Sequence, residues 1–445
     1  MMNVESSLLL TDLYQLTMLQ GYFERGLTGI AAFEFFVRKL HPNRGFLIMA
    51  GLEQVLDFLE QSKFTSEELD WLRSTGRFTK DFIDWLADWH FEGEVQAMRE
   101  GTICFPSEPL LRVVASLPQA QLIETRLINL LHFQTLIASK AARSVLMAPG
   151  KLLVDFGLRR AHGAEAGLLA ARATYLAGFS GTSTVLANKR FGIPLYGTMA
   201  HSFVQAHDTE IEAFRVFAHA QPDNVVLLVD TYDTEAAAHQ VVALGHELSK
   251  EGIAVKGIRL DSGDLAGLAK RVRSILDEGG LNSTTIFASG DLDEYRLLEL
   301  LAQGAPIDGF GIGTRLDTSA DAPYLDCAYK LQEYDERPRR KRSTGKVTWP
   351  GRKQVWRQYD DEGRLAGDIL SLAKDSQNGE PLLVTVMSGG SRLESRLSLE
   401  EVRQYALYNL GRLPARLASL TEGYVYPVAI APALHELAAT MDAQE

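Results

Sequence analysis

The chain has 445 residues, a formal net charge of −12 at pH 7 and a hydrophobic content of 46%. This length is sufficient for two or three domains with a large buried core, and the acidic balance disfavours general nucleic-acid binding. The two cysteines, Cys104 and Cys327, are far apart in the sequence and lack metal-ligand spacing. A disulfide framework and a zinc site are therefore disfavoured. Because the sequence also lacks a signal-peptide pattern and a membrane-spanning apolar run, we expect a soluble cytoplasmic protein without membrane or nucleic-acid partners.

The N-terminal part has mixed helical and strand patterns. Apolar residues at helical spacing over 8–25 predict an amphipathic helix capped near Thr11 or Asp12. The run 30–37 predicts a strand, and the punctuated alternation of 91–116 predicts antiparallel strands. We therefore expect an α+β domain over residues 1–120.

A group of residues that can carry positive charge follows the first predicted strand: Arg38, Lys39, His41 and Arg44. A second basic segment, 336–357, has glycine and proline breaks. Each is either a solvated surface loop or an attraction site for phosphate groups. The sequence alone leaves both readings open.

Short apolar runs alternate with helical segments from about residue 150 onward. The runs lie within 151–160, 178–192, 225–234, 254–264, 284–294 and 307–314. This alternation is typical of parallel β/α units whose strands are buried on both faces. No Gly-x-Gly-x-x-Gly pattern opens the series, so an α/β barrel is favoured over an open dinucleotide-binding sheet. We expect the barrel over residues 121–335 and a C-terminal segment, 336–445, that packs with the N-terminal domain.

Polar residues gather where these predicted strands end. The carboxyl ends of barrel strands build the active site. The run Phe191 to Leu195, which contains Pro194, predicts a strand that delivers His201 to this face. His201 could act as a general base or as a phosphate carrier, and Asp230, at the end of the next strand, could hold the imidazole tautomer.

The chemistry of the remaining strand ends points to a phosphorylated sugar. Arg159 and Arg259 could each clamp an oxyanion, and glycine-rich turns offer backbone N–H groups to anions. Asp261 and Asp264 could accept ribose hydroxyls or help to hold Mg²⁺ around a diphosphate. Helix N-capping is the alternative role of Asp264.

Seven motifs, taken together and in order, resemble the nicotinate phosphoribosyltransferase family: TDLYQLTM (11–18), FEFFVR (33–38), DFGLRRAHG (155–163), GTMAHSFV (197–204), RLDSGDL (259–265), GFGIGT (309–314) and GKVTWPGRKQVWR (345–357). The resemblance implies an irregular α/β barrel of the type II phosphoribosyltransferase kind, with an added α+β domain built from both chain ends. It implies synthesis of nicotinate mononucleotide and diphosphate from nicotinate and phosphoribosyl diphosphate, coupled to ATP hydrolysis through a phosphohistidine, in NAD biosynthesis. It also implies a homodimer with shared active sites, and Mg²⁺ bound with phosphoribosyl diphosphate and ATP rather than in a protein-built metal site.

The resemblance also assigns roles to individual residues. It implies His201, which would carry the phosphoryl group, and Asp230 as catalytic residues, and we also predict Asp261 as catalytic from its own chemistry as a possible ribose or Mg²⁺ contact. The predicted substrate-binding residues are Tyr14, which would stack on the pyridine ring across the dimer interface, Thr198 and Arg259 for nicotinate, and Arg159, Gly290, Gly311, Gly313 and Thr314 for the sugar phosphates.

Ser183 separates this chain from nicotinamide-using relatives, which resemble F-x-G-T-D-T where this sequence has Phe-Ser-Gly-Thr-Ser-Thr over 179–184. An aspartate would accept from a carboxamide NH₂ group and repel a carboxylate, so Ser183 favours the acid substrate. Two alternatives remain open on the sequence: a nicotinamide or quinolinate phosphoribosyltransferase, and a non-catalytic phosphosugar sensor.

Overall fold

The computed structural model describes residues 6–420 and 423–444. The chain forms two compact units, one made by residues 1–139 and 324–445 and the other by residues 140–323. These limits follow packing, and the division into 1–120, 121–335 and 336–445 stays a prediction. Among the residues that the structure describes, no helix is long and apolar enough to cross a membrane.

The first unit contains elements from both ends of the chain. Its N-terminal elements are α1 (Leu13–Arg25), β1 (Ile30–Val37), β2 (Leu47–Ile48), α2 (Leu52–Gln61), α3 (Ser66–Ser74), α4 (Lys80–Leu86), β3 (Glu94–Ala97), β4 (Ile103–Cys104), β5 (Pro109–Ser116) and α5 (Leu117–Leu122). Its C-terminal elements are β12 (Cys327–Tyr334), β13 (Arg337–Pro338), β14 (Lys353–Tyr359), β15 (Leu365–Leu372), β16 (Glu380–Pro381), β17 (Val384–Ser388), β18 (Ser391–Arg392), α15 (Leu399–Gly411), α16 (Ala415–Ala418), β19 (Val428–Ile430) and α17 (Pro432–Ala443). Helix α6 (Glu124–Met147) begins in this unit and ends in the other.

Strand β1 is an interior strand of the first unit's main sheet, whose order is β13-β12-β1-β5-β3-β17-β18. Its residues from Ala31 to Val37 are all buried, as expected of a strand covered on both faces. Glu34 lies in the middle of this strand, where its carboxylate pairs with Arg112 (3.2 Å) and Lys353 (2.8 Å). These partners offset the cost of burying a charge. Because β12 and β17 come from the C-terminal part, the predicted construction of this domain from both chain ends is confirmed.

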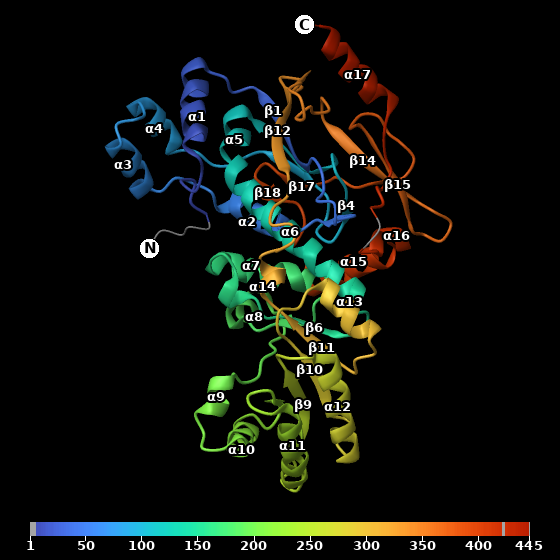
Figure 1. The fold of residues 1–445 in the computed structure, drawn as a ribbon. Coiled ribbons are helices and arrows are strands. Elements are labelled where there is room, and N and C mark those ends of the chain that lie inside the picture. The colour runs from blue at the N-terminus through green and yellow to red at the C-terminus, as the bar shows by residue number, and fades with distance from the viewer. Residues whose placement is uncertain (1–5, 421–422, 445) are drawn as a thin grey trace. The chain divides into compact units, whose positions relative to one another are not determined.

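The second unit is an α/β barrel with one break. Its elements are β6 (Leu152–Asp155), η1 (Leu158–Arg160), α7 (Ala164–Leu176), β7 (Gly181–Thr182), α8 (Val185–Phe191), α9 (His201–Gln205), α10 (Glu210–Ala220), β8 (Val225–Leu228), α11 (Thr234–Ser249), β9 (Val255–Leu260), α12 (Leu265–Glu278), β10 (Thr285–Ala288), α13 (Glu294–Ala302), β11 (Gly309–Ile312) and α14 (Thr314–Asp317). The strands pair in parallel in the order β7-β6-β11-β10-β9-β8. The first strand of the series, β6, pairs with the last, β11. The strand order is therefore that of a barrel that is open between β7 and β8. Figure 1 shows β6, β11, β10 and β9 in succession, with α11 and α12 alongside.

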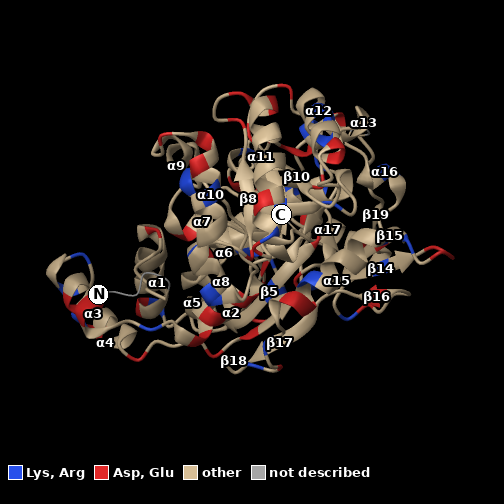
Figure 2. Cartoon of the chain, turned by 90° about the horizontal axis from the view of Figure 1, so that it is seen from below, with Lys and Arg blue, Asp and Glu red and all other residues tan. Residues whose placement is uncertain are grey.

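Aspartates start the helices that follow three barrel strands. Asp233, Asp264 and Asp293 each accept a hydrogen bond from a backbone N–H in the first turn of α11, α12 and α13. Each is therefore an N-cap, and for Asp264 the capping alternative is the one that the structure shows. Figure 2 shows charged residues of both signs on α12, where Arg273 pairs with Asp277 at 2.7 Å. Short turns that end in a capped helix hold the strand-end residues at one rim of the sheet.

Two local predictions differ from the structure. Helix α1 begins at Leu13, directly after the predicted cap position Asp12 rather than at residue 8, and the Asp12 carboxylate accepts from Thr125 (2.9 Å) instead of from a helix N–H. The predicted strand over Phe191 to Leu195 is wrong, because Phe191 ends α8 and only Leu195 forms an isolated bridge, to Thr182. Apolar residues at short spacing fit a helix and a strand equally well, and Pro194 limits further pairing.

Candidate active site

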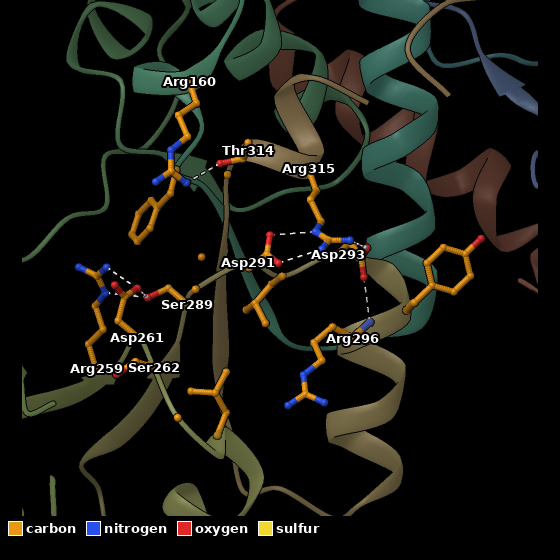
Figure 3. A pocket seen from close by; sticks show the side chains of 18 of the residues that line it. Arg160, Arg259, Asp261, Ser262, Ser289, Asp291, Asp293, Arg296, Thr314 and Arg315 are labelled. Carbon is orange, nitrogen blue, oxygen red and sulfur yellow. Dashed lines mark hydrogen bonds and ion pairs between the residues drawn. The ribbon is translucent and has the colours of Figure 1, made fainter. Parts of the chain in front are cut away.

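A cavity of about 840 Å³ opens at the carboxyl ends of the barrel strands in the second unit. Its walls come from the turns after β6, β9, β10 and β11 and from the start of α13. Figure 3 shows Arg160, Arg259, Arg296 and Arg315 around it, each from a different element. An acidic chain thus concentrates guanidinium groups in one cavity, which is the charge pattern that phosphate binding requires.

Arg259 and Asp261 are fixed to each other at the end of β9. The guanidinium donates from Nη2 to Asp261 Oδ1 (2.8 Å) and from Nε to Ser289 Oγ (2.8 Å). Ser289 in turn donates to Asp261 Oδ1 (2.5 Å). Burial alone would raise the pKa of Asp261, but donation from Ser289 and the charge of Arg259 hold that pKa below its ordinary value. The carboxylate is therefore ionised throughout the neutral range.

His201 is the first residue of α9, a short helix in the break of the barrel. Its Nδ1 lies 3.1 Å from Thr231 Oγ1, and its Nε2 lies 3.8 Å from Asp261 Oδ2. The imidazole is 41% exposed, so one edge remains open to a ligand. His201 is thus oriented by the hydroxyl of Thr231 and faces the ionised carboxylate of Asp261.

Asp230 does not pair with His201, contrary to the prediction. Its Oδ2 accepts from the backbone N–H of Asp261 (3.0 Å) and from Ser262 Oγ (2.6 Å). Its Oδ1 is buried and has no hydrogen-bond partner among the residues that the structure describes. The carboxylate therefore holds the turn after β9 and keeps one acceptor oxygen unsatisfied. The residue following Asp230, rather than Asp230 itself, contacts the imidazole.

Two further arginines are placed by partners on the cavity wall. Arg160 donates from Nη1 to Thr314 Oγ1 (2.9 Å), linking the turns after β6 and β11. Arg315 makes a two-point contact with Asp291, with bonds of 2.9 and 2.8 Å. The Arg315 guanidinium lowers the pKa of Asp291 below its ordinary value. Figure 3 shows Arg315 between Asp291 and Asp293.

Gly290 allows the turn after β10 to approach the turn after β9. Its φ is +99°, and a Cβ at this position would lie 2.1 Å from the carbonyl oxygen of Asp261. A side chain is excluded there on both grounds. The predicted glycine position thus has a structural reason in this chain.

A smaller cavity of about 360 Å³ lies beside the larger one and shares Phe156, Arg159 and Arg259 with it. Ser183 and Thr198 line it as well. Arg259 stacks over the Phe156 ring, with 5.6 Å between Cζ and the ring centroid. One wall is therefore aromatic and another cationic, a combination that suits a flat aromatic acid.

The structure brings most predicted site residues together. Those that line the larger cavity are Arg159, Arg259, Asp261, Gly290, Gly311, Gly313 and Thr314. Tyr14 belongs to the first unit, where its side chain is 47% exposed on α1. The sequence assigned no role to several residues at the site, among them Phe156, Thr231, Ser289 and Arg315. Phe156, Thr231 and Ser289 lie within the runs that end the predicted strands and Arg315 directly follows the last run, so position in the sequence was their only signal.

The two basic segments both belong to the first unit. Arg38, Lys39, His41 and Arg44 line a cavity of about 450 Å³, and Arg38 pairs with Asp326 at 3.0 Å. In the second segment, Arg340 donates to the Ala438 carbonyl (2.8 Å) and pairs with Asp442 (2.7 Å) near the end of α17. A cation at a helix C-terminus interacts favourably with the helix dipole. Part of this segment is thus structural.

The fold and the site define an α/β-barrel protein whose arginine-lined cavity at the strand ends suits anionic ligands. Residues 9–132 match the model of the nicotinate phosphoribosyltransferase (NAPRTase) N-terminal domain, and residues 152–337 match that of the NAPRTase family. The chain is 48% identical to nicotinate phosphoribosyltransferase pncB2 of Mycobacterium tuberculosis over 95% of this chain and 91% of that protein. It is 42% identical to nicotinate phosphoribosyltransferase of Bacillus subtilis over 84% and 78%. The chain belongs to the nicotinate phosphoribosyltransferase family.

Solved structures agree with this membership. Human nicotinic acid phosphoribosyltransferase superposes with a TM-score of 0.87 at 29% identity, covering 97% of this chain and 99% of that one. Nicotinate-nucleotide pyrophosphorylase of Pyrococcus furiosus superposes with a TM-score of 0.75 at 26% identity, covering 93% and 97%. The predicted fold class is confirmed by both.

Proposed function

We propose that this protein is a nicotinate phosphoribosyltransferase, which forms nicotinate mononucleotide and diphosphate from nicotinate and phosphoribosyl diphosphate. One observation carries this proposal beyond family membership: a large cavity lined by arginines adjoins a small aromatic and cationic cavity, and Arg259 belongs to both. A phosphorylated sugar and a pyridine acid would therefore meet beside one guanidinium. The product would supply NAD biosynthesis.

Phosphoribosyl diphosphate is assigned to the larger cavity. Its phosphates would lie against Arg159 and the turns that contain Gly290, Gly311, Gly313 and Thr314. The ring nitrogen of nicotinate would attack C1 of the sugar as diphosphate leaves through an oxocarbenium-like transition state. The chain contributes positioning and charge neutralisation rather than covalent chemistry at C1.

Nicotinate is assigned to the smaller cavity. Arg259 would meet the substrate carboxylate, with Thr198 and Ser183 on the same wall. A serine adds no negative charge there, whereas an aspartate would repel the carboxylate. Tyr14 would stack on the pyridine ring from the partner of a homodimer with shared active sites.

His201 is proposed to take a phosphoryl group from ATP on a ring nitrogen. The bond between the γ-phosphorus and the bridging oxygen breaks, ADP leaves, and hydrolysis of the phosphohistidine later returns inorganic phosphate. Thr231 at Nδ1 holds the ring orientation, which favours reaction at Nε2, the nitrogen that faces Asp261. Asp261 is the second proposed catalytic group. Asp230 would act by holding the Asp261 backbone.

Mg²⁺ fits the residues present, although the described residues contain no group of three or more potential protein ligands for a metal. Magnesium in proteins is commonly held by one or two carboxylates together with substrate phosphates. The buried, unpartnered Oδ1 of Asp230 is an oxygen of this kind, and Asp261 is its neighbour. Bound with phosphoribosyl diphosphate or ATP, the ion would neutralise phosphate charge.

The deciding experiment measures nicotinate mononucleotide and ADP together, from nicotinate, phosphoribosyl diphosphate and Mg²⁺, with and without ATP. Mononucleotide whose formation rises with ATP, with matching ADP, supports both the transfer and the coupling. Mononucleotide without an ATP effect keeps the transfer and removes the phosphohistidine step. His201→Asn should abolish coupling while leaving slow synthesis; unchanged ADP release by this variant would refute the role of His201.

The alternatives give different outcomes in the same assay. Turnover of nicotinamide but not of nicotinate would identify a nicotinamide phosphoribosyltransferase. Turnover of quinolinate with CO₂ release, but not of nicotinate, would identify a quinolinate phosphoribosyltransferase. Binding of phosphoribosyl diphosphate without turnover of any of the three would favour a sensor. A cytoplasmic location accompanies the proposed role and stays a prediction.

A further inference from the structure

Two buried aspartates lie behind the wall of the larger cavity without lining it. Asp155 is the last residue of β6, and Asp317 is the last residue of α14. Their exposed fractions are 0% and 1%. The cavity is lined by Phe156, which follows Asp155, and by Thr314, which begins α14. Neither aspartate is among the proposed substrate contacts.

Gly157 brings the two carboxyl groups to one place. Its N–H donates to Asp155 Oδ1 (2.8 Å). A Cβ at Gly157 would lie 2.1 Å from Cγ of Asp317, so the Asp317 carboxyl group packs directly on this glycine. The two acids therefore meet around a single backbone position.

Asp155 receives hydrogen bonds from two donors, whereas Asp317 receives none from the described residues. Asp155 accepts from Gly157 and from Thr182 Oγ1 (2.6 Å). Both oxygens of Asp317 are buried, and no donor reaches them from the residues that the structure describes. Two ionised carboxylates here would repel each other and leave Asp317 unsatisfied. A proton on Asp317 resolves both problems, because Asp317 then donates to Asp155. Consistently, burial and the charge of Asp155 raise the pKa of Asp317 well above its ordinary value.

The pair joins the two turns that carry phosphate-side residues. The turn after β6 leads to Arg159 and Arg160, and α14 begins with Thr314. Arg160 donates to Thr314 on the cavity side (2.9 Å), as Figure 3 shows. The carboxyl pair makes a second connection between the same turns on the buried side.

We propose that Asp317 is a positioning residue that acts as a neutral acid, donating to Asp155 and thereby fixing the Arg159 turn against the Thr314 turn for binding of the phosphorylated sugar. This inference rests on the proposed function and adds a residue that touches no substrate. Asp317 acts through the backbone of Gly157 and through α14.

The test compares Asp317→Asn with Asp317→Leu. An asparagine amide can donate to Asp155 as the neutral acid does, whereas leucine keeps the branched outline without a donor. We expect Asp317→Asn to keep the KM for phosphoribosyl diphosphate within about twofold of wild type, and Asp317→Leu to raise it about tenfold, which corresponds to loss of one buried hydrogen bond. The KM for nicotinate should change much less. Asp223→Leu, at an exposed position in the same unit, is the control for the substitution type.

Calorimetry should measure the binding of phosphoribosyl diphosphate to each variant directly, and melting curves should measure the stability of each variant. If the leucine variant does not fold, Asp317→Ala removes the donor without added volume and has the same expected result. The proposal would be overturned if the Asn variant and the donor-free variants had the same KM and the same dissociation constant for phosphoribosyl diphosphate, whether all were impaired or none was.

Infrared difference spectroscopy supplies a readout independent of activity. Wild type minus Asp317→Asn should show the carbonyl band of a protonated carboxyl group at neutral pH, and its absence would overturn the neutral-acid assignment. Failure of the proposed function is recognised separately, because wild type would then give no turnover while the infrared comparison still reports on Asp317.

Discussion

His201 and Asp261 face each other at the rim of the barrel, with 3.8 Å between Nε2 and Oδ2. This distance is too long for a hydrogen bond, but it places the ionised Asp261 carboxylate directly beside the ring nitrogen. Asp261 is simultaneously held by Arg259, which lines both cavities. The proposed phosphoryl-accepting site and the proposed nicotinate site are therefore connected through one carboxylate.

Asp261→Asn should reduce kcat/KM for mononucleotide synthesis about 10- to 100-fold, in the range for loss of a positioned charged group that stabilises a transition state. The amide keeps the size of the side chain but removes the charge that faces His201 and Arg259. The ratio of ADP released to mononucleotide formed should change as well, because His201 loses the carboxylate that faces it. Steady-state rates of both products measure the effect. Asp264→Asn is the matched control, since asparagine is an equally good N-cap for α12. A wild-type rate in Asp261→Asn would remove Asp261 from the catalytic residues.

Ser183→Asp should weaken nicotinate binding by at least tenfold in KM, because a carboxylate in the smaller cavity would repel the substrate carboxylate. The KM for nicotinamide, which has no charge, should rise much less. The ratio of kcat/KM for nicotinate to kcat/KM for nicotinamide should therefore fall. Ser183→Asn adds the same volume without charge and separates repulsion from crowding. If Asp and Asn variants raise the KM for nicotinate equally, charge at position 183 does not select the substrate.

The sequence predicted the parallel strands and the rim residues because these depend on local patterns. The mostly buried strands β8 to β11 and the capping by Asp264 are properties of short segments. The placement of His201 was not predictable in the same way, since the apolar residues before it fit a helix as well as a strand. The contact between Thr231 and His201 joins residues 30 positions apart, and no periodicity in either segment encodes it.

Glu210, the first residue of α10, should make stability depend on pH. Burial, followed by the charges of Asp233 and Asp230, raises its pKa from 4.5 to about 7. The native state therefore keeps a proton that the unfolded chain has already released, and Glu210 lowers stability progressively as pH rises from 4.5 to about 7. Glu210→Gln removes this titration.

The Tm of Glu210→Gln relative to wild type should therefore rise between pH 4.5 and 7 and level off above pH 7. Calorimetric melts at closely spaced pH values measure the difference. Glu212→Gln, at an exposed position on the same helix, should show no such rise. A constant Tm difference over this range would contradict a raised pKa at Glu210.

Arg357→Met should destabilise the first unit by about 3–5 kcal/mol, the cost of leaving one member of a buried ion pair without its partner. Arg357 and Asp368 are each 2% exposed, and the guanidinium donates to both carboxylate oxygens, at 3.1 and 2.7 Å. Denaturant unfolding monitored by fluorescence measures the loss. Arg364→Met is the control, because its pair with Glu362 is 54% and 67% exposed and should contribute less than about 1 kcal/mol. Adding Asp368→Leu to Arg357→Met should restore part of the stability, since the stranded Asp368 carboxylate is then removed while buried Glu108 and Tyr426 lose a partner. A double variant no more stable than Arg357→Met would show that the loss comes from packing of the arginine against Phe105 rather than from the stranded carboxylate.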